Sequence, residues 1–328
     1  MLAKRPTENQ EAYEAYIKGR YFWNKRTPED LKKAAGYFQQ ALEMDPTYAL
    51  AYAGLADTYS YQGYAFGRLP PKEAIPRAKA LAEQAVQMDD ALGEAHSALA
   101  LAKFLDWDFA GAGPEFEHSI ELNPNYPSSH HFYAVYLSEV LGRFDDALVE
   151  ANKGLQLDPM SLPLNNIVAF LSYESHRWDA ALEQYRKFAQ IFPNANVHFN
   201  LSDCYKHKGT GKEAGQEFLE GMKASGASES RLQAYRRTYT NSGWNGVKLK
   251  QTEENVTEWN RNPWHCSAYG IAISYADCGD KNQALQWLQK ACDAHSGMLI
   301  WIKTEPALDN LRSDVRFQDL VGRIGFPQ

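Results

Sequence analysis

Cysteine is scarce in this sequence, and long hydrophobic runs do not occur in it. The four cysteines, Cys204, Cys266, Cys278 and Cys292, include no CxxC pair, which is typical of reduced thiols on helices. The longest apolar run, GMLIWI at 297–302, is far shorter than the ~20 residues that span a bilayer. The first 16 residues also lack the apolar core of a signal peptide. We therefore expect a cytoplasmic protein that makes no contact with a membrane.

An excess of basic residues is also missing. The 328 residues include 34 Lys and Arg against 41 Asp and Glu, which gives a formal net charge of -7. Binding to a polyanion requires a basic surface, because phosphate contacts come mainly from Lys and Arg. We therefore expect that this chain does not bind nucleic acid.

Motifs that carry catalysis or hold a cofactor are absent as well. The sequence contains no GxGxxG, GxxxxGK[ST], GxSxG or HExxH pattern. His130 and His131 are adjacent, so on a helix they point about 100° apart and do not share one metal ion easily. Asp106 and Asp108 flank Trp107 at an expected helix-to-helix turn, where a cap and a packing ring are the commoner roles. The sequence thus predicts no enzyme activity, no metal and no cofactor.

A repeated phrase is what the sequence does contain. Helix-ending stretches such as ALEMDP, SIELNP and GLQLDP stop at a proline, and Pro124, Pro159 and Pro193 are separated by 35 and 34 residues. A related stretch, AVQMDD, ends at Asp90, which lies 34 residues before Pro124. Proline ends a helix because it has no N–H to donate and clashes with the preceding turn. The spacing therefore indicates a structural repeat of about 34 residues.

Small and large residues alternate within each period as a helical hairpin requires. In one unit Ala100 and Ala112 precede Phe116, and in another Ala169 and Ala181 precede Tyr185 at the same spacing. Small residues let the two helices approach closely, and the large ring fills the groove between them. Each hairpin buries its apolar face only against a neighbouring hairpin, so the units should stack.

This pattern resembles the tetratricopeptide repeat (TPR) family along nearly the whole chain. The resemblance implies an all-α, right-handed α-solenoid of about eight helix-turn-helix repeats with a C-terminal covering helix segment. We expect three regions: six units in 1–224, an irregular helical pair or degenerate seventh unit in 225–262, and an eighth unit with its covering tail in 263–328. The second unit carries an insertion, YQGYAFGRLPPKEA, between its helices.

In this family the first helix of each repeat lines the concave side. The corresponding positions predict a peptide-binding groove rich in aromatic rings, which give large contact area at a low cost in entropy. The alternative for each ring is packing against neighbouring turns. The predicted groove residues are Tyr13, Tyr16, Arg20, Trp23, Asp57, Ser60, Phe104, His131, Asn166, Phe170, Tyr173, Phe199 and Asp203.

The clamp by which some family members hold a terminal carboxylate is missing, since its positions carry Ala53, Gly54 and Asp57 in one unit and Glu94, Ser97 and Ala98 in the next. Binding of chaperone tails is therefore disfavoured. We expect instead a non-catalytic scaffold that binds a protein or peptide in its concave groove.

Three stretches, at 16–59, 107–126 and 312–325, are similar to C-terminal TPR arrays of bacterial multidomain regulators. In those proteins the array follows a winged-helix, cyclase or Ser/Thr kinase domain. The similarity implies a module of a larger bacterial regulatory protein. One alternative is a small-molecule-sensing repeat domain that controls a fused output domain, and another is self-association through the irregular zone or an exposed end.

Overall fold

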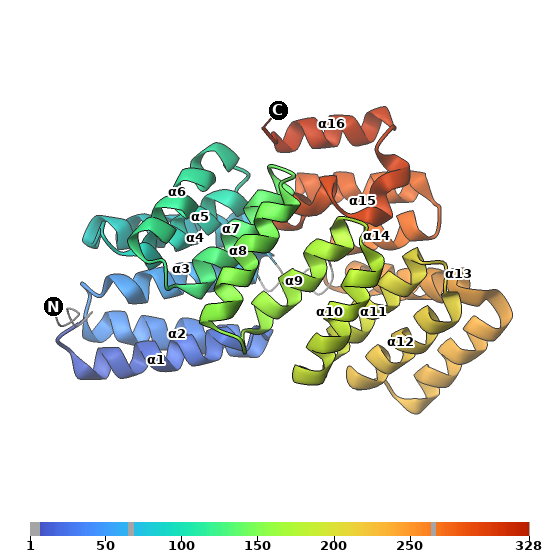
Figure 1. Ribbon diagram of the computed structural model, residues 1–328, viewed down its shortest axis with the longest axis horizontal. Coiled ribbons are helices and arrows are strands. Elements are labelled where there is room, and N and C mark those ends of the chain that lie inside the picture. Colours follow the sequence, from blue (N-terminus) through green and yellow to red (C-terminus); the bar gives the residue numbers. More distant parts are fainter. Residues whose placement is uncertain (1–6, 65–68, 264–266, 328) are drawn as a thin grey trace.

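The computed structural model describes residues 7–64, 69–263 and 267–327, and these residues form helices packed in antiparallel pairs (Figure 1). Part of the predicted insertion and Cys266 lie outside the described residues. Six pairs follow one another along the array: α1 (Gln10–Asn24) and α2 (Pro28–Met44), α3 (Ala49–Tyr64) and α4 (Pro71–Met88), α5 (Gly93–Leu105) and α6 (Phe109–Leu122), α7 (Pro127–Glu139) and α8 (Phe144–Leu157), α9 (Leu162–Glu174) and α10 (Trp178–Ile191), α11 (Ala195–His207) and α12 (Gly211–Ala224).

Small residues on neighbouring helices allow close packing around large rings. The ring of Phe38 on α2 is fully buried between Gly19 of α1 and Gly54 of α3. A Cβ atom on either glycine would lie 2.6 Å from Phe38 Cε1, a distance that real Cβ atoms essentially never show. The absence of a side chain at both positions therefore allows α1 and α3 to pack on the same ring.

The seventh region is one long helical element with a break inside it. α13 (Glu229–Arg261) contains Gly243 at φ 62° and ψ -159°, a backbone conformation that only glycine adopts readily. The break turns the chain between two helical arms, which enclose Tyr235 and Val247 with Phe218 of α12 in one buried cluster. α14 (Ala268–Asp277) and α15 (Lys281–Asp293) then restore a regular pair.

The C-terminal residues divide into two parts with different positions. α16 (Val315–Ile324) packs against α15 near the end of the array, as Figure 1 shows. The two preceding 3₁₀ helices, η1 (Gly297–Lys303) and η2 (Pro306–Leu311), instead turn back into the array, where η1 contacts α3 and α7 and η2 contacts α14. The sequence predicted a tail that covers the end of the stack, and this inward turn was not predicted.

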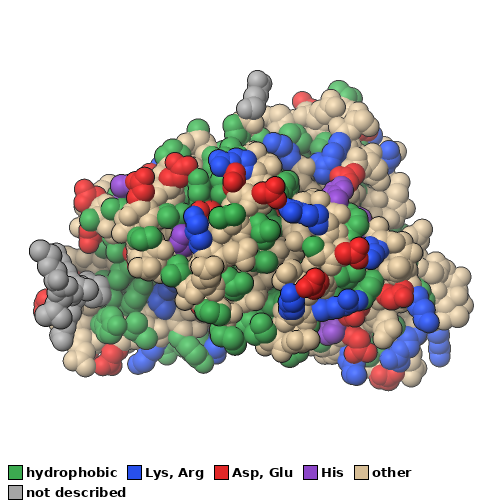
Figure 2. Space-filling model, in the orientation of Figure 1, with side chains coloured by type: hydrophobic (Ala, Val, Ile, Leu, Met, Phe, Trp, Pro, Cys, Tyr) green, Lys and Arg blue, Asp and Glu red, His purple; other side chains and the backbone are tan. Residues whose placement is uncertain are grey.

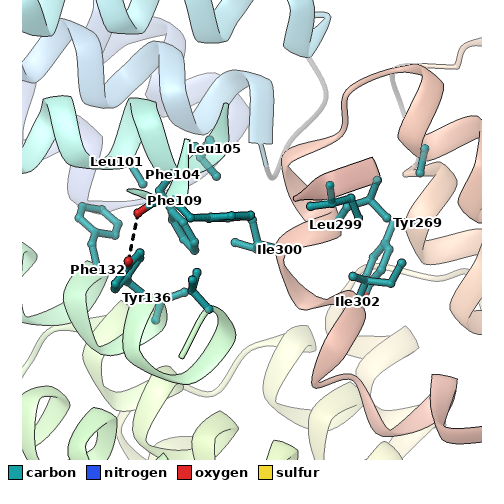
Figure 3. Close-up of a cluster of buried hydrophobic side chains, with 14 of the residues drawn as sticks. Leu101, Phe104, Leu105, Phe109, Phe132, Tyr136, Tyr269, Leu299, Ile300 and Ile302 are labelled. Atoms are coloured by element: carbon teal, nitrogen blue, oxygen red, sulfur yellow. Dashed lines mark hydrogen bonds between the residues drawn. The ribbon is translucent and has the colours of Figure 1, made fainter. Parts of the chain in front are cut away.

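The side chains of η1 complete a core that joins both halves of the chain. Leu299, Ile300 and Ile302 are buried almost completely. In Figure 3, Ile300 points toward the cluster of Phe104 and its neighbours on α5 and α7, whereas Leu299 and Ile302 lie beside Tyr269 of α14. The segment GMLIWI is therefore an interior element of the fold.

On the face shown in Figure 2, basic and acidic side chains are interspersed. None of the helices in the described part of the chain combines the length and the apolar character needed to cross a bilayer.

Candidate functional site: the concave channel

The concave side of the solenoid contains a cavity of about 930 Å³. Its walls come from the first helices of the second to sixth units and of the last pair, from the second arm of α13, and from η1 and η2. Aromatic and aliphatic side chains form much of the lining, and several amide and charged groups join them at the α11–α13 side, among them Asn200, Asp203, Lys248 and Gln251.

The indole of Trp301 anchors η1 within this channel. Its Nε1–H donates a hydrogen bond to the Tyr64 hydroxyl oxygen at 2.7 Å. The Phe170 ring meets the indole edge to face, with ring centroids 5.0 Å apart. The array thus holds an aromatic residue of its own chain between its second and fifth units, and a hydrogen bond satisfies the indole donor.

Behind η1, the hydroxyl of Thr304 lies between two buried carboxyl groups. Its Oγ1 is within hydrogen-bonding distance of Glu139 Oε2 and is 2.7 Å from Glu174 Oε1. A hydroxyl has one proton, so it can donate to only one carboxylate. The second carboxyl group can satisfy the contact only when it is itself protonated and donates to the hydroxyl oxygen. Burial accordingly raises the pKa of Glu139 to about 7 and places that of Glu174 well above its ordinary value.

A third buried carboxyl group begins η2. Glu305 Oε1 accepts hydrogen bonds from the Ala307 amide at 3.0 Å and from the Tyr173 hydroxyl at 3.2 Å. Burial raises the pKa of Glu305 to about 7, although the Ala307 amide opposes that shift. The neighbouring His207 is half-buried, and this burial and the charge of Lys206 lower its pKa to about 4.

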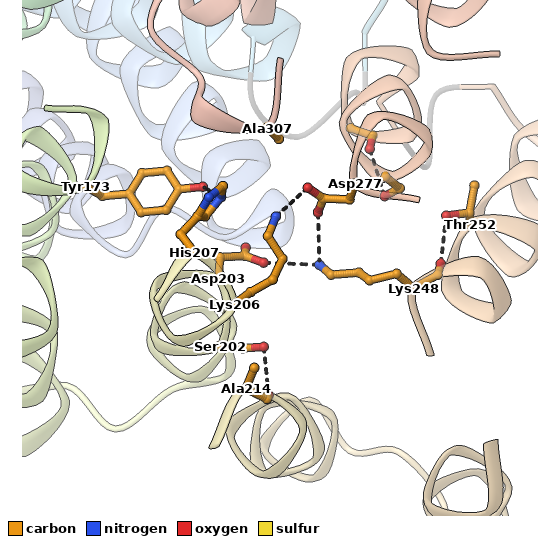
Figure 4. Close-up of polar contacts among 12 residues, drawn as sticks. Tyr173, Ser202, Asp203, Lys206, His207, Ala214, Lys248, Thr252, Asp277 and Ala307 are labelled. Carbon is orange, nitrogen blue, oxygen red and sulfur yellow. Dashed lines mark hydrogen bonds and ion pairs between the residues drawn. The ribbon is translucent and has the colours of Figure 1, made fainter. Parts of the chain in front are cut away.

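An ion network lies at the α11–α14 side of the channel (Figure 4). The ammonium group of Lys248 is 3.1 Å from Asp203 Oδ1 and 3.7 Å from Asp277 Oδ2, and Lys206 pairs with the same Asp277. Burial would lower the pKa of Lys248, but the two carboxylates outweigh it and raise that pKa. Lys248 therefore keeps its charge, and the network ties the second arm of α13 to α11 and α14.

A smaller cavity of about 560 Å³ lies next to the channel, where the end of α1 faces the starts of α7 and α9. Lys25, Arg26 and His131 line both cavities. Burial, with the charge of Arg26, lowers the pKa of His131 to about 3, so this imidazole is neutral at physiological pH.

About half of the predicted groove residues line the larger cavity. Phe104, His131, Asn166, Phe170, Tyr173 and Asp203 do so, while Arg20 and Trp23 line the smaller one together with His131.

The other predicted groove residues line neither cavity. Tyr16 packs against Phe38 and Tyr48, and the Phe199 ring packs against Phe218. Asp57 and Ser60 are buried, and Tyr13 is 43% exposed on α1. Asp57 is paired with Arg20 at 3.3 Å. Peptide binding by the predicted set stays a prediction.

Sequence reasoning missed the lining residues that lie outside the regular first helices. Among them are Lys248 and Gln251 on α13 and Trp301 and Glu305 on the C-terminal segment. One signal was present, because GMLIWI is the most apolar run of the sequence and lies in a region without the repeat period. An apolar stretch of that kind requires burial, but its sequence does not indicate where.

Among the described residues, no group of three or more His, Cys, Asp and Glu side chains is arranged to hold a metal ion. Neither a family model nor a curated protein matches the sequence. Solved structures do match.

Human IFIT1, solved as a dimer with m7Gppp-AAAA, is similar with a TM-score of 0.54 and 15% identity over 86% of this chain and 72% of that one. Yeast Tom70 gives a TM-score of 0.51 and 16% identity over 98% of this chain and 69% of that one. TTC0263, described as a thermophilic TPR protein of Thermus thermophilus, gives a TM-score of 0.49 and 17% identity. The match covers 60% of this chain and 99% of that one.

In the structure itself, the first helices begin at Gly93, Pro127, Leu162 and Ala195, which keeps the period of about 34 residues. With its antiparallel helix pairs, the chain has the fold of a right-handed tetratricopeptide-repeat solenoid.

Proposed function

We propose that this chain is a non-catalytic interaction module that binds a segment of a partner protein in its concave channel. The observation that carries the proposal is the position of η1. An apolar segment of the chain itself lies in the channel, with Trp301 between Tyr64 and Phe170. The channel therefore has the shape and the chemistry to hold a peptide with apolar and aromatic anchors.

The cavity beside η1 offers both kinds of contact that such a peptide needs. Asn200 Nδ2 donates to Asn166 Oδ1 at 3.2 Å, and each amide can form further hydrogen bonds to an extended backbone. The Phe170 ring provides an apolar surface one turn further along α9. We place the partner segment along α9 and α11, next to the C-terminal segment.

We also propose that the module belongs to a larger bacterial regulatory protein. The three stretches that are similar to regulator arrays support this context. The module would then connect the binding of a partner to an output domain outside this sequence.

Site-specific photo-crosslinking tests the location of the partner. A photoreactive amino acid replaces Asn166 in the channel, and a control variant carries it at Val149, which is 56% exposed on α8. We expect a crosslinked partner protein from the Asn166 position and none from Val149. Equal crosslinking at both positions, or none to any protein, would contradict the proposal, and an adduct with a second copy of the chain would favour self-association.

A second candidate function is the sensing of a small molecule, and the ion network favours it. Asp203, Lys248 and Gln251 converge on a cavity whose volume is within the usual range for ligand pockets. Native mass spectrometry separates the two candidates. A retained small molecule that is lost on substitution of Gln251, with no crosslinked protein, would replace the peptide proposal.

A further inference from the structure

Arg26 is a buried arginine in the turn between α1 and α2. Its backbone has a positive φ of 55°, and the residue is only 8% exposed. The guanidinium carbon lies 3.4 Å from the centroid of the Trp23 ring and 3.8 Å from that of Tyr61. The two rings fix the position of the charged group by cation–π contact.

The hydrogen-bonding groups of Arg26 are not satisfied within the described part of the chain. Its Nε and Nη1 atoms are buried and have no hydrogen-bond partner there. The carboxylate of Asp57 is nearby, but its Oδ2 is paired with Arg20 at 3.3 Å, and its Oδ1 has no hydrogen-bond partner either. Buried donors without partners destabilise a fold, so an arginine of this kind points to a ligand that accepts its hydrogen bonds.

The smaller cavity supplies the space and further donors. Arg26 lines it, together with Arg20 and Lys25 from α1 and its following turn. The first turns of α7 and α9, including Ser128 and Ser161, line it from the other side. Neither helix has a side-chain hydrogen bond at its N-cap, so their positive ends face the cavity without an acidic cap.

The balance of charge around the cavity is favourable to an anion. Arg20 is compensated by Asp57, and the remaining lining charges are Lys25 and Arg26 against Asp158. His131 contributes no charge, because burial and the guanidinium of Arg26 hold its pKa near 3.

We propose that this cavity binds an oxyanion, either a carboxylate or a phosphate, which accepts hydrogen bonds from one edge of the Arg26 guanidinium group. The planar fork of a guanidinium group matches two oxygens of either group. The further donors are the amides of Ser128 and Leu162 at the starts of α7 and α9, because Pro127 and Pro163 have no N–H. The site adjoins the proposed peptide contacts, since Arg26 lines both cavities, but it is argued from its own observations and does not depend on that proposal.

Thermal unfolding in the presence of defined anions tests the site. The intact chain is heated at pH 7 in sodium phosphate, in sodium succinate and in sodium chloride of equal ionic strength. The variant R26M keeps an apolar side chain against the two rings but removes the charge. The control R143M removes an exposed arginine of the α7–α8 turn, outside both cavities.

We expect phosphate or succinate to raise the midpoint of unfolding in the natural chain and in R143M but not in R26M. The apparent dissociation constant of the active probe should rise at least about tenfold in R26M, as the loss of charge-assisted hydrogen bonds implies. A response to succinate alone identifies a carboxylate source, and a response to phosphate alone identifies a phosphate source.

Without a probe, R26M should be at least as stable as the natural chain, since it removes unsatisfied donors. Should R26M fail to fold, the arginine Nε–Hε resonances of the natural chain are followed by NMR during the same titration. A shift of the Arg26 resonance supports the site. The absence of any shift with both probes, or an equal midpoint increase in R26M, overturns it.

Discussion

The buried pair of Glu139 and Glu174 predicts that the stability of the fold depends on pH through one shared proton. The relevant change is Glu174→Gln, which replaces one carboxyl group by a neutral group of the same shape. In the natural chain, the Thr304 hydroxyl can satisfy both carboxyl groups only while one of them is protonated. In the variant, the amide supplies a permanent donor, so that requirement disappears.

The sign and size of the effect follow from the raised pKa. The folded chain keeps a proton on the pair up to a pH of about 7, whereas the unfolded chain loses it near the ordinary value of 4.5. The stabilising effect of that proton is present in full below 4.5 and is lost as pH rises through about 7. One pKa unit corresponds to about 1.4 kcal/mol, so the total for one proton is roughly 3 kcal/mol.

The assay compares the urea unfolding of E174Q and of the natural chain by circular dichroism between pH 4.5 and 8. Other groups titrate in this range. Glu305, with its pKa of about 7, has the same sign, and His131 and His207, with lowered pKa values, have the opposite sign below about 6.5. These contributions are common to both chains, so the prediction concerns the difference between them.

We expect the free energy of unfolding of E174Q, relative to the natural chain, to rise by roughly 3 kcal/mol across this pH range. The matched control is E183Q, which changes an exposed glutamate on α10 and should keep a nearly constant difference. A constant difference for E174Q as well would show that the pair does not hold a proton at neutral pH and would refute the reasoning.

Two further substitutions test the packing and the ion network, both by urea unfolding. Gly54→Ala places a methyl group against Phe38 and should destabilise the fold by about 1–3 kcal/mol. In the control Gly36→Ala the new methyl group meets no atom within 4 Å, so this change should stabilise the fold by roughly 0.5–1 kcal/mol. Equal effects of the two substitutions would contradict the packing account. Lys248→Met leaves the partly buried Asp203 without its ammonium partner and Asp277 with Lys206 alone, and should cost about 1.5–3 kcal/mol. The control Lys250→Met removes a surface pair, with an expected cost below about 1 kcal/mol, and a similar small cost for Lys248→Met would show that the network is dispensable.

The sequence by itself determined the helical hairpins and their order. Each hairpin packs mainly on its neighbours, so the residues that specify it lie within one or two periods of 34. Gly19 and Gly54, on either side of Phe38, are 35 positions apart, close to one such period, and their small size can be read directly from the sequence. The conformation at Gly243, which breaks α13, could not be predicted from the sequence.

Only the tertiary structure decided what occupies the concave channel. A small rotation at each repeat accumulates along the solenoid, and the sum brings α1 beside the start of α9 and allows η1 to reach α3 and α7. The total rotation along the solenoid cannot be read from any local sequence pattern. Trp301 meets Tyr64 across 237 positions of the chain, and Arg26 faces residues of two later units. A repeat fixes nearest neighbours through short-range packing, whereas contacts across the turn of the superhelix depend on the whole array.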